Sequence, residues 1–158
     1  MKEKMTSFEE ELAEKGRLVY KNAGTSMLPL IRENRDVIVL ERCEGNDPCK
    51  FDVVLFRRMN VRGRGEYVLH RILKRDRDGN YLIAGDNCSS LETVQPEQIL
   101  ARLTEVKRGN RTVRMTDLTY RIYVFLWCAP YPLRFLLMKG KTLVRRVGSR
   151  LLRKEKRM

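Results

Sequence analysis

One serine and the only histidine of the chain could together carry out acyl transfer. Ser26 lies in the turn-like sequence GTSMLP at residues 24–29, and His70 lies in the strand-like run YVLHRI at residues 67–72. Asp86 follows in the turn-like sequence AGDN. A serine hydroxyl is a weak nucleophile at neutral pH, so a base must accept its proton and a third group must hold that base. These three residue types are the minimal set for such chemistry.

Each of the three residues also has a purely structural interpretation. Ser26 could cap a helical turn that follows it, which is a common role for serine. A single histidine on a strand is often a core or edge residue, and an aspartate between Gly and Asn often bonds its own backbone in a turn. The chemical interpretation therefore depends on all three motifs occurring together in one chain.

Length and charge limit what the chain can be. Its 158 residues allow one compact domain with an appendage, and 42% apolar residues are enough for a core. The formal net charge is +13, but residues 120–158 hold eleven of the 33 basic residues against one acid, Glu155. The rest of the chain is nearly balanced, so the excess positive charge belongs mostly to the C-terminal segment.

The cysteines and the N-terminal region predict a reducing environment without a bound metal. Four irregularly spaced cysteines and one histidine do not form a zinc pattern, and no cofactor is expected. A Cys43–Cys49 disulfide is one option, but reduced and partly buried thiols are preferred. Residues 1–18 are charged and lack the apolar region of a secretory signal. We therefore expect a cytoplasmic or membrane-associated protein.

The hydrophobic pattern predicts a mainly β fold, a small coiled antiparallel sheet with a helical C-terminal extension. Short apolar or β-branched runs separated by turn residues are typical of such sheets. Helices are expected at residues 7–15 and, for one or two turns, at 27–32. Strands are expected at residues 18–20, 36–40, 52–56, 66–74, 81–84, 99–106 and 111–115. The predicted units are an N-terminal helix (1–17), a catalytic domain (18–117) and a tail (118–158).

The C-terminal tail combines a hydrophobic stretch with a basic one. Residues 119–138 are the most hydrophobic, but two arginines and two prolines interrupt them, so they fall short of a membrane-spanning helix. A helical hairpin or kinked interfacial segment is expected there, followed by a basic amphipathic helix over 139–157. Binding of nucleic acid without sequence specificity and packing on the domain are the alternatives. An anionic membrane surface contacted by residues 119–158 is the preferred partner, with no specific nucleic acid.

Four motifs in series resemble those of the type I signal peptidases. GTSMLP (24–29) is similar to their nucleophile motif Gly-x-Ser-Met-x-Pro, and DVVLF (52–56) to their Asp-Val-Val strand motif. LHRI (69–72) resembles the His-Arg-Val/Ile motif of the endoplasmic-reticulum-type branch, in which histidine replaces the bacterial lysine. GDN (85–87) resembles the Gly-Asp-Asn motif. The resemblance covers roughly residues 18–106, in the family order.

This resemblance implies roles for individual residues. Ser26 would be the nucleophile and His70 the general base, with Thr25 and Met27 as candidates for substrate or oxyanion contacts. For Met27 the preferred role is structural, shaping the turn and packing beside the nucleophile. Asp86 is the preferred orienting acid. Glu92 is the alternative, since eukaryotic members carry a further aspartate at that position. The family also usually has a membrane helix directly before its serine motif, whereas this chain has its hydrophobic segment after the domain.

The function implied is that of a serine endopeptidase that cleaves signal or leader peptides, so a peptide or precursor protein is the expected substrate. Activity should rise with pH through a pKa near 6.5–7. Self-cleaving repressors with a related fold are disfavoured because they use a lysine base and carry a DNA-binding unit before the serine domain. A catalytically idle module that binds a membrane or a partner through its basic tail is the main alternative.

Overall fold

The computed structural model describes residues 8–43, 48–59, 62–136 and 138. It confirms a mainly β chain built on a single antiparallel sheet of eight strands with a few short helices. The elements, in order, are α1 (Phe8–Lys15), β1 (Arg17–Lys21), β2 (Val37–Arg42), β3 (Val53–Met59), β4 (Gly65–Arg75), β5 (Tyr81–Ala84), β6 (Glu92–Val94), the 3₁₀ turn η1 (Pro96–Gln98), β7 (Ile99–Arg108), β8 (Arg111–Arg114), α2 (Leu118–Tyr123) and the π-helical η2 (Val124–Cys128).

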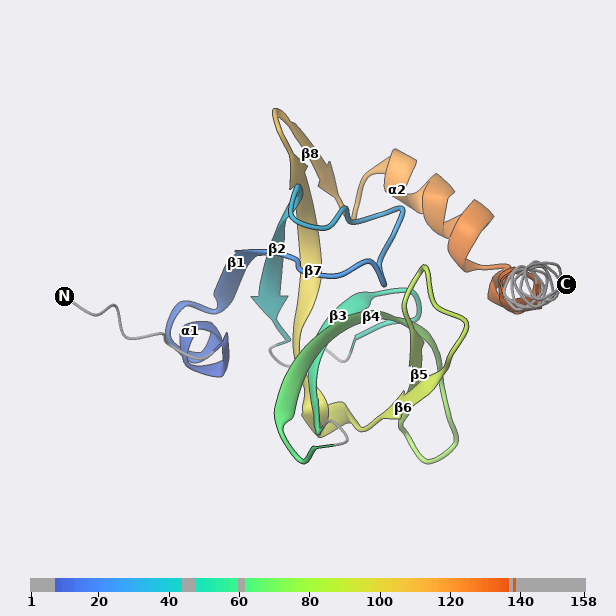
Figure 1. Cartoon of the computed structure of the whole chain (residues 1–158), viewed down its shortest axis with the longest axis horizontal. Coiled ribbons are helices and arrows are strands. Elements are labelled where there is room, and N and C mark those ends of the chain that lie inside the picture. Colours follow the sequence, from blue (N-terminus) through green and yellow to red (C-terminus); the bar gives the residue numbers. More distant parts are fainter. Residues whose placement is uncertain (1–7, 44–47, 60–61, 137, 139–158) are drawn as a thin grey trace, which may run out of the picture.

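The strands follow one another across the sheet in the order β1-β2-β7-β3-β4-β5-β6, and β8 pairs with β7. Register shifts interrupt the β2–β7, β3–β7 and β4–β5 ladders. Such irregularities bend strands and increase their twist. The half of the sheet formed by β3 to β6 consequently curls back on itself, as Figure 1 shows. All seven predicted strands are present; β6, only three residues long, was missed.

Two hydrophobic clusters fill the two faces of the sheet. The larger cluster joins residues from α1, β1, β2, β3, β4 and β7, with Leu12, Leu40 and Leu103 among its buried members. The smaller cluster includes Phe56, Ile72 and Ile83 and lies inside the curled half. Successive residues of a strand point to opposite faces, so the even-numbered side chains of β4 up to Ile72 belong to the curled half. His70 is one of them.

The N-terminal helix forms where the sequence predicts it. Three glutamates occupy the first turn of α1 and Lys15 its last, which suits the helix dipole. Gly16 ends the helix in a left-handed conformation (φ 65°), and its N–H donates to the carbonyl of Leu12 at 2.9 Å. The predicted cap Ser7 lies outside the described residues.

The predicted helical turns at residues 27–32 are wrong, since this stretch forms consecutive turns and no helix. One helix-like bond is made, from Ile31 N to the carbonyl of Met27 at 3.0 Å. Pro29 has no N–H to continue the ladder and disfavours helical geometry at Leu28. The chain around Ser26 is therefore held by its surroundings and not by a helix.

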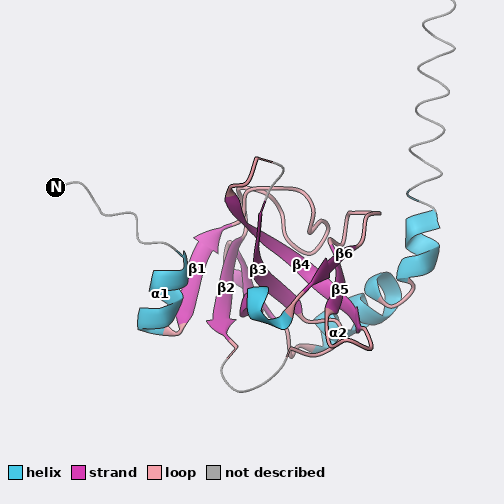
Figure 2. Cartoon of the chain, turned by 90° about the horizontal axis from the view of Figure 1, so that it is seen from below, coloured by secondary structure: helices cyan, strands magenta, loops and turns pink. Residues whose placement is uncertain are grey.

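The C-terminal segment packs beside the β4–β5 part of the sheet, at the opposite end from α1 (Figures 1 and 2). The predicted interruption near the two prolines is present: α2 and η2 end in a turn at residues 129–130, and a second helical stretch covers 131–136. Within the described part of the chain, no helix is long and apolar enough to cross a bilayer. The amphipathic helix predicted at 139–157 lies outside the described residues.

Candidate active site

The turn that carries Ser26 is fixed to the sheet by a buried carboxylate. Asp36 is completely buried and forms an ion pair with Arg108 of β7 at 2.6 Å. The same carboxylate accepts a hydrogen bond from Arg32 N at 2.9 Å, and Arg108 also donates to the carbonyl of Leu30 at 3.0 Å. These contacts fasten the 24–36 region to β7 through residues 30, 32 and 36, so the position of Ser26 is set without regular secondary structure.

Two residues beside Ser26 were candidates for substrate or oxyanion contacts, and the structure separates them. The side chain of Met27 is fully buried in the larger core cluster, so it anchors the turn and cannot touch a substrate. The inclusion of Met27 as a contact residue was therefore wrong for its side chain. Thr25 is exposed, and its carbonyl accepts a hydrogen bond from Asn87 Nδ2 at 3.2 Å. Thr25 stays a candidate.

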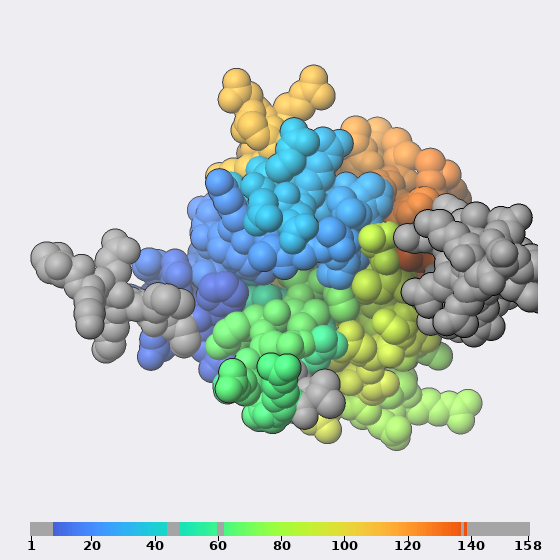
Figure 3. Space-filling view, viewed as in Figure 1, coloured from blue at the N-terminus to red at the C-terminus, as the bar shows by residue number. Residues whose placement is uncertain are grey.

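The loop after β5 brings the serine turn and the histidine together. Asn87 N donates to the carbonyl of Ser26 at 2.8 Å. A Cβ placed on Gly85 would lie 2.6 Å from the Ser26 carbonyl oxygen and 3.1 Å from His70 Nε2. Hence the Ser26 backbone and the imidazole meet around one glycine that has no room for a side chain. Figure 3 shows the blue segment of the serine turn against this yellow-green loop.

His70 is a buried base with an acid behind it. Its exposed fraction is 6%, and its ring faces Phe56 with 6.1 Å between the ring centroids. Nε2 is the nitrogen near Gly85, while Nδ1 lies 3.3 Å from Glu92 Oε1. This is ion-pair distance, but the approach does not satisfy hydrogen-bond geometry, and among the described residues Nδ1 has no hydrogen-bond partner. One ring nitrogen thus faces the Glu92 carboxylate, and the other lies beside the loop that holds the Ser26 backbone.

Arg58 of β3 contacts the second carboxylate oxygen of Glu92, the one that is not next to His70. Its Nη1 contacts Glu92 Oε2, and its guanidinium also pairs with Glu66 at 2.6 Å. Glu92 thus divides its two oxygens between His70 and Arg58. The arginine fixes the direction of the carboxylate and weakens its attraction for a proton on the imidazole.

The ionisation of His70 follows from these neighbours. Burial of the ring lowers the pKa of His70 below its ordinary 6.5, the Glu92 carboxylate opposes this shift, and the positive charge of Arg58 adds to it. The imidazole is therefore neutral at pH 7 and able to accept a proton. The lowered pKa of His70 moves the expected rise in activity to a lower pH than the 6.5–7 predicted from the sequence.

Asp86 does not face the histidine. Its buried carboxylate receives two hydrogen bonds from Arg71, at 2.7 Å each, and one from the hydroxyl of Tyr123, also at 2.7 Å. Arg71 follows His70 on β4 and so points to the other side of the strand. The preference for Asp86 over Glu92 as the orienting acid is therefore reversed: Glu92 lies against Nδ1, and Asp86 fastens the loop.

Cys88 is a further neighbour of the imidazole. Its Sγ would lie 2.9 Å from a Cβ on Gly85, on the same side as His70 Nε2 and the Ser26 carbonyl. Burial and the nearby Glu92 carboxylate raise the pKa of the Cys88 thiol. A protonated thiol is a poor nucleophile, so Ser26 stays the nucleophile candidate. No disulfide joins any of the four cysteines, which all lie in the described part of the chain.

Sequence reasoning missed Arg58 altogether. It lies 34 positions before Glu92 in the sequence, and the folding of the sheet brings its side chain to that carboxylate, so no local pattern marks it.

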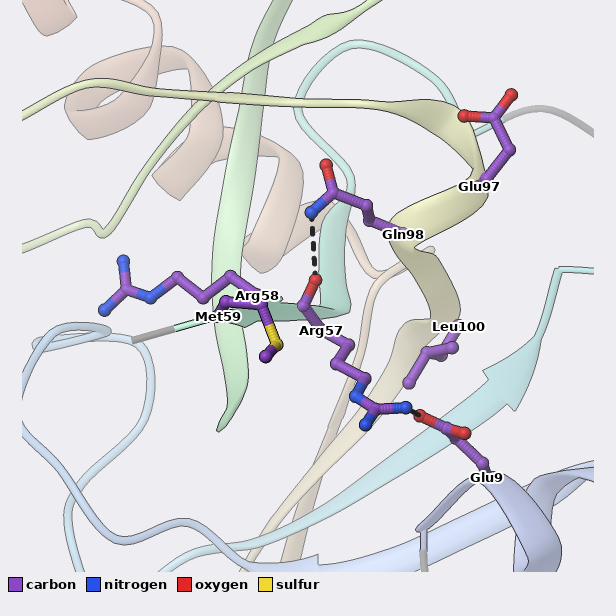
Figure 4. A pocket seen from close by; sticks show the side chains of 7 residues that line it. All are labelled: Glu9, Arg57, Arg58, Met59, Glu97, Gln98 and Leu100. Atoms are coloured by element: carbon purple, nitrogen blue, oxygen red, sulfur yellow. Dashed lines mark hydrogen bonds and ion pairs between the residues drawn. The ribbon is translucent and has the colours of Figure 1, made fainter. Parts of the chain in front are cut away.

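Arg58 also lines a cavity of about 330 Å³, drawn in Figure 4. Arg57 and Arg58 point in opposite directions there, and Arg57 contacts Glu9. Its lining residues are Glu9, Arg57, Arg58, Met59, Glu97, Gln98 and Leu100.

Comparisons of this chain with protein-family models, with curated proteins and with solved structures find no match. The case for a function therefore rests on the residues and geometry of the site itself.

Proposed function

We propose that this protein is a serine endopeptidase of the signal peptidase type, with Ser26 as nucleophile, His70 as general base and Glu92 as the acid that orients it. The observation that carries the proposal is the meeting of the Ser26 backbone and His70 Nε2 around Gly85, with a carboxylate at Nδ1. The four motifs in family order add support. The coiled antiparallel sheet is compatible with the signal peptidase fold, which is part of the proposal.

The reaction would proceed through an acyl-enzyme. Neutral His70 accepts the Ser26 proton as the hydroxyl oxygen bonds to the peptide carbonyl carbon, and the protonated ring gives that proton to the departing amine as the C–N bond breaks. Water, deprotonated by His70, then releases the acyl group. The Ser26 N–H and Thr25 are the proposed oxyanion donors; one such donor contributes ~2.7–4 kcal/mol in the transition state.

The proposed substrate is an extended segment of a signal or leader peptide. Such a peptide can lie along an exposed strand edge and use main-chain hydrogen bonds for affinity. The resemblance implies cleavage after small residues. The position of the hydrophobic segment after the domain favours a leader peptide presented on the cytoplasmic side.

Covalent labelling tests the proposed nucleophile. The full chain is incubated with a fluorophosphonate, and the modified residue is located by peptide mass spectrometry. We expect labelling at Ser26 that is lost in Ser26→Ala and strongly slowed in His70→Gln, while Ser90→Ala, which removes an exposed serine nearby, labels like the wild type. Cleavage of a peptide library should disappear in the same two variants. Undiminished cleavage by Ser26→Ala would contradict the assignment.

The second candidate is a catalytically idle module that binds a membrane or a partner. The observation in its favour is the large exposed apolar surface of the C-terminal segment. An idle module would leave Ser26 unlabelled and every library peptide intact, yet would retain binding through this segment.

A further inference from the structure

The C-terminal segment exposes large apolar side chains on the side turned away from the sheet. We call this surface the apolar ridge; its members are Leu118, Ile122, Phe125, Leu126, Trp127, Leu133 and Leu136. Phe125 is 74% exposed and Leu118 70%. Residues 118, 122, 125 and 126 recur at helical spacing, so their side chains gather on one face. Contiguous exposed apolar surface of this kind marks a binding site for a protein or a membrane.

The other face of the same segment is already occupied. Tyr120 and Cys128 are buried against the Arg71–Asp86 pair, and Phe135 packs with Leu73 and Ala84. The segment is therefore apolar on both sides, with one side used by the fold. Among the ridge residues, Trp127 also fastens the segment, because its Nε1 donates to the carbonyl of Asp86 at 3.2 Å.

The charge around the ridge is positive. Residues 118–136 contain no acid and two arginines, of which Arg121 is exposed and Arg134 buried. In sequence, residues 139–158 add nine basic residues against Glu155. Exposed Lys50 and Arg121 border a cavity of about 290 Å³ whose apolar wall includes Phe51, Val124 and Phe125. Asp52 is the acid of this cavity, and it lies 3.5 Å from Arg102.

We propose that the apolar ridge docks this protein on an anionic lipid bilayer, lying in the interface with its side chains among the acyl chains. Lys50 and Arg121, which are both exposed, then face lipid phosphates. Apolar side chains flanked by cations are the pattern of interfacial membrane segments.

The apolar ridge contacts the loop of the proposed active site through one of its own residues, Trp127. Trp127 Nε1 donates to the carbonyl of Asp86 at 3.2 Å, and the Tyr123 hydroxyl donates to the carboxylate of the same residue. In the loop, Asp86 is flanked by Gly85 and Asn87. Gly85 lies beside His70 Nε2 and the Ser26 carbonyl, and Asn87 N donates to that carbonyl. On the proposed function, docking would therefore hold the active site next to the bilayer, where a membrane-bound precursor is presented.

Vesicle flotation of the full chain tests the docking. We expect binding to vesicles of phosphatidylglycerol and phosphatidylcholine, weak binding to phosphatidylcholine alone, and loss of binding as salt is raised. The double variant Phe125→Ser/Leu126→Ser should weaken binding to the anionic vesicles by about 10-fold or more. Met59→Ser removes an equally exposed apolar side chain of β3 and should bind like the wild type. Lys50→Gln/Arg121→Gln should reduce the preference for anionic vesicles.

Three results would overturn the proposal. Absence of flotation removes it. Equal flotation by the Phe125/Leu126 double variant, with unchanged thermal unfolding, assigns binding to the tail and not to the ridge. A dimer in light scattering that the double variant abolishes, without flotation of the wild type, assigns the ridge to a second copy. Ser26→Ala should float like the wild type, so failure of docking and failure of the peptidase assignment are distinguished.

Discussion

Two arginine–carboxylate pairs lie on opposite sides of β4 and differ in their surroundings. Arg71 and Asp86 are both completely buried and meet through two parallel hydrogen bonds. The Arg58–Glu92 pair is partly exposed, and its carboxylate also faces His70. The first pair joins the sheet, the active-site loop and the C-terminal segment, whereas the second can respond to a proton on the imidazole. Similar residue types thus hold the fold in one pair and, on the proposed function, serve catalysis in the other.

The surroundings explain this division. Asp86 accepts hydrogen bonds on both oxygens, and burial together with this carboxylate raises the pKa of Tyr123, so its hydroxyl stays a donor. The charge of Asp86 is therefore fully engaged. Glu92 has His70 as its neighbour, and on the proposed function its charge would stabilise the imidazolium that forms during catalysis.

The largest predicted effect breaks the buried pair. Arg71→Met leaves the Asp86 carboxylate buried without its cation, and such a change lowers the free energy of unfolding by about 3–5 kcal/mol. Urea unfolding measures this loss. Arg102→Met is the matched control: it removes an arginine paired with Asp52 at 3.5 Å on the surface, where a pair contributes about 1 kcal/mol or less.

A double variant sharpens the same comparison. Arg71→Met/Asp86→Leu removes both charges, so it should recover part of the lost stability. If Arg71→Met is no more harmful than Arg102→Met, the buried pair does not have the structural role given to it here.

The sequence predicted the sheet well because short apolar or β-branched runs and the turn residues between them are local signals. It also placed Ser26, His70 and the 85–87 loop in one site through motif order. The choice between Asp86 and Glu92 could not be made from the sequence, because both acids follow His70 within a short distance. Strand alternation sends His70 and Arg71 to opposite sides of β4, and the pairing of β4 with β5 and of β5 with β6 places Glu92 on the His70 side. Such pairing is a property of the whole sheet.

The next effect concerns activity and not stability. Glu92→Gln keeps the size of the side chain but removes the charge that stabilises the imidazolium, so we expect the cleavage rate at pH 7 to fall by about 10²-fold. Glu66→Gln removes a carboxylate that contacts the same Arg58 without reaching His70, and it should retain most of the activity. Asp86→Asn is not a fair substitute for this test, because it disturbs the buried pair. Equal losses in Glu92→Gln and Glu66→Gln would remove Glu92 from the proposed catalytic set.

The smallest effect is a shift in pH dependence, and it tests whether Arg58 acts through the imidazole. In the wild type, activity should rise with pH through a midpoint below 6.5, because only neutral His70 is a base and burial and Arg58 lower its pKa. Arg58→Gln removes the positive charge and frees Glu92 to favour imidazolium, so the pKa of His70 rises and the midpoint moves to higher pH. Activity should therefore fall more at pH 6 than at pH 8.

Two variants separate this electrostatic role from a structural one. Arg58→Lys keeps the charge and should return the midpoint toward the wild-type value. Arg57→Gln removes the neighbouring arginine, which contacts Glu9 on the other side of the cavity, and should leave the midpoint unchanged. A structural defect would lower activity by the same factor at every pH, whereas loss of a charge near His70 moves the curve along the pH axis. An unmoved midpoint in Arg58→Gln would show that the Arg58–Glu92 pair, like the Arg71–Asp86 pair, only holds the fold.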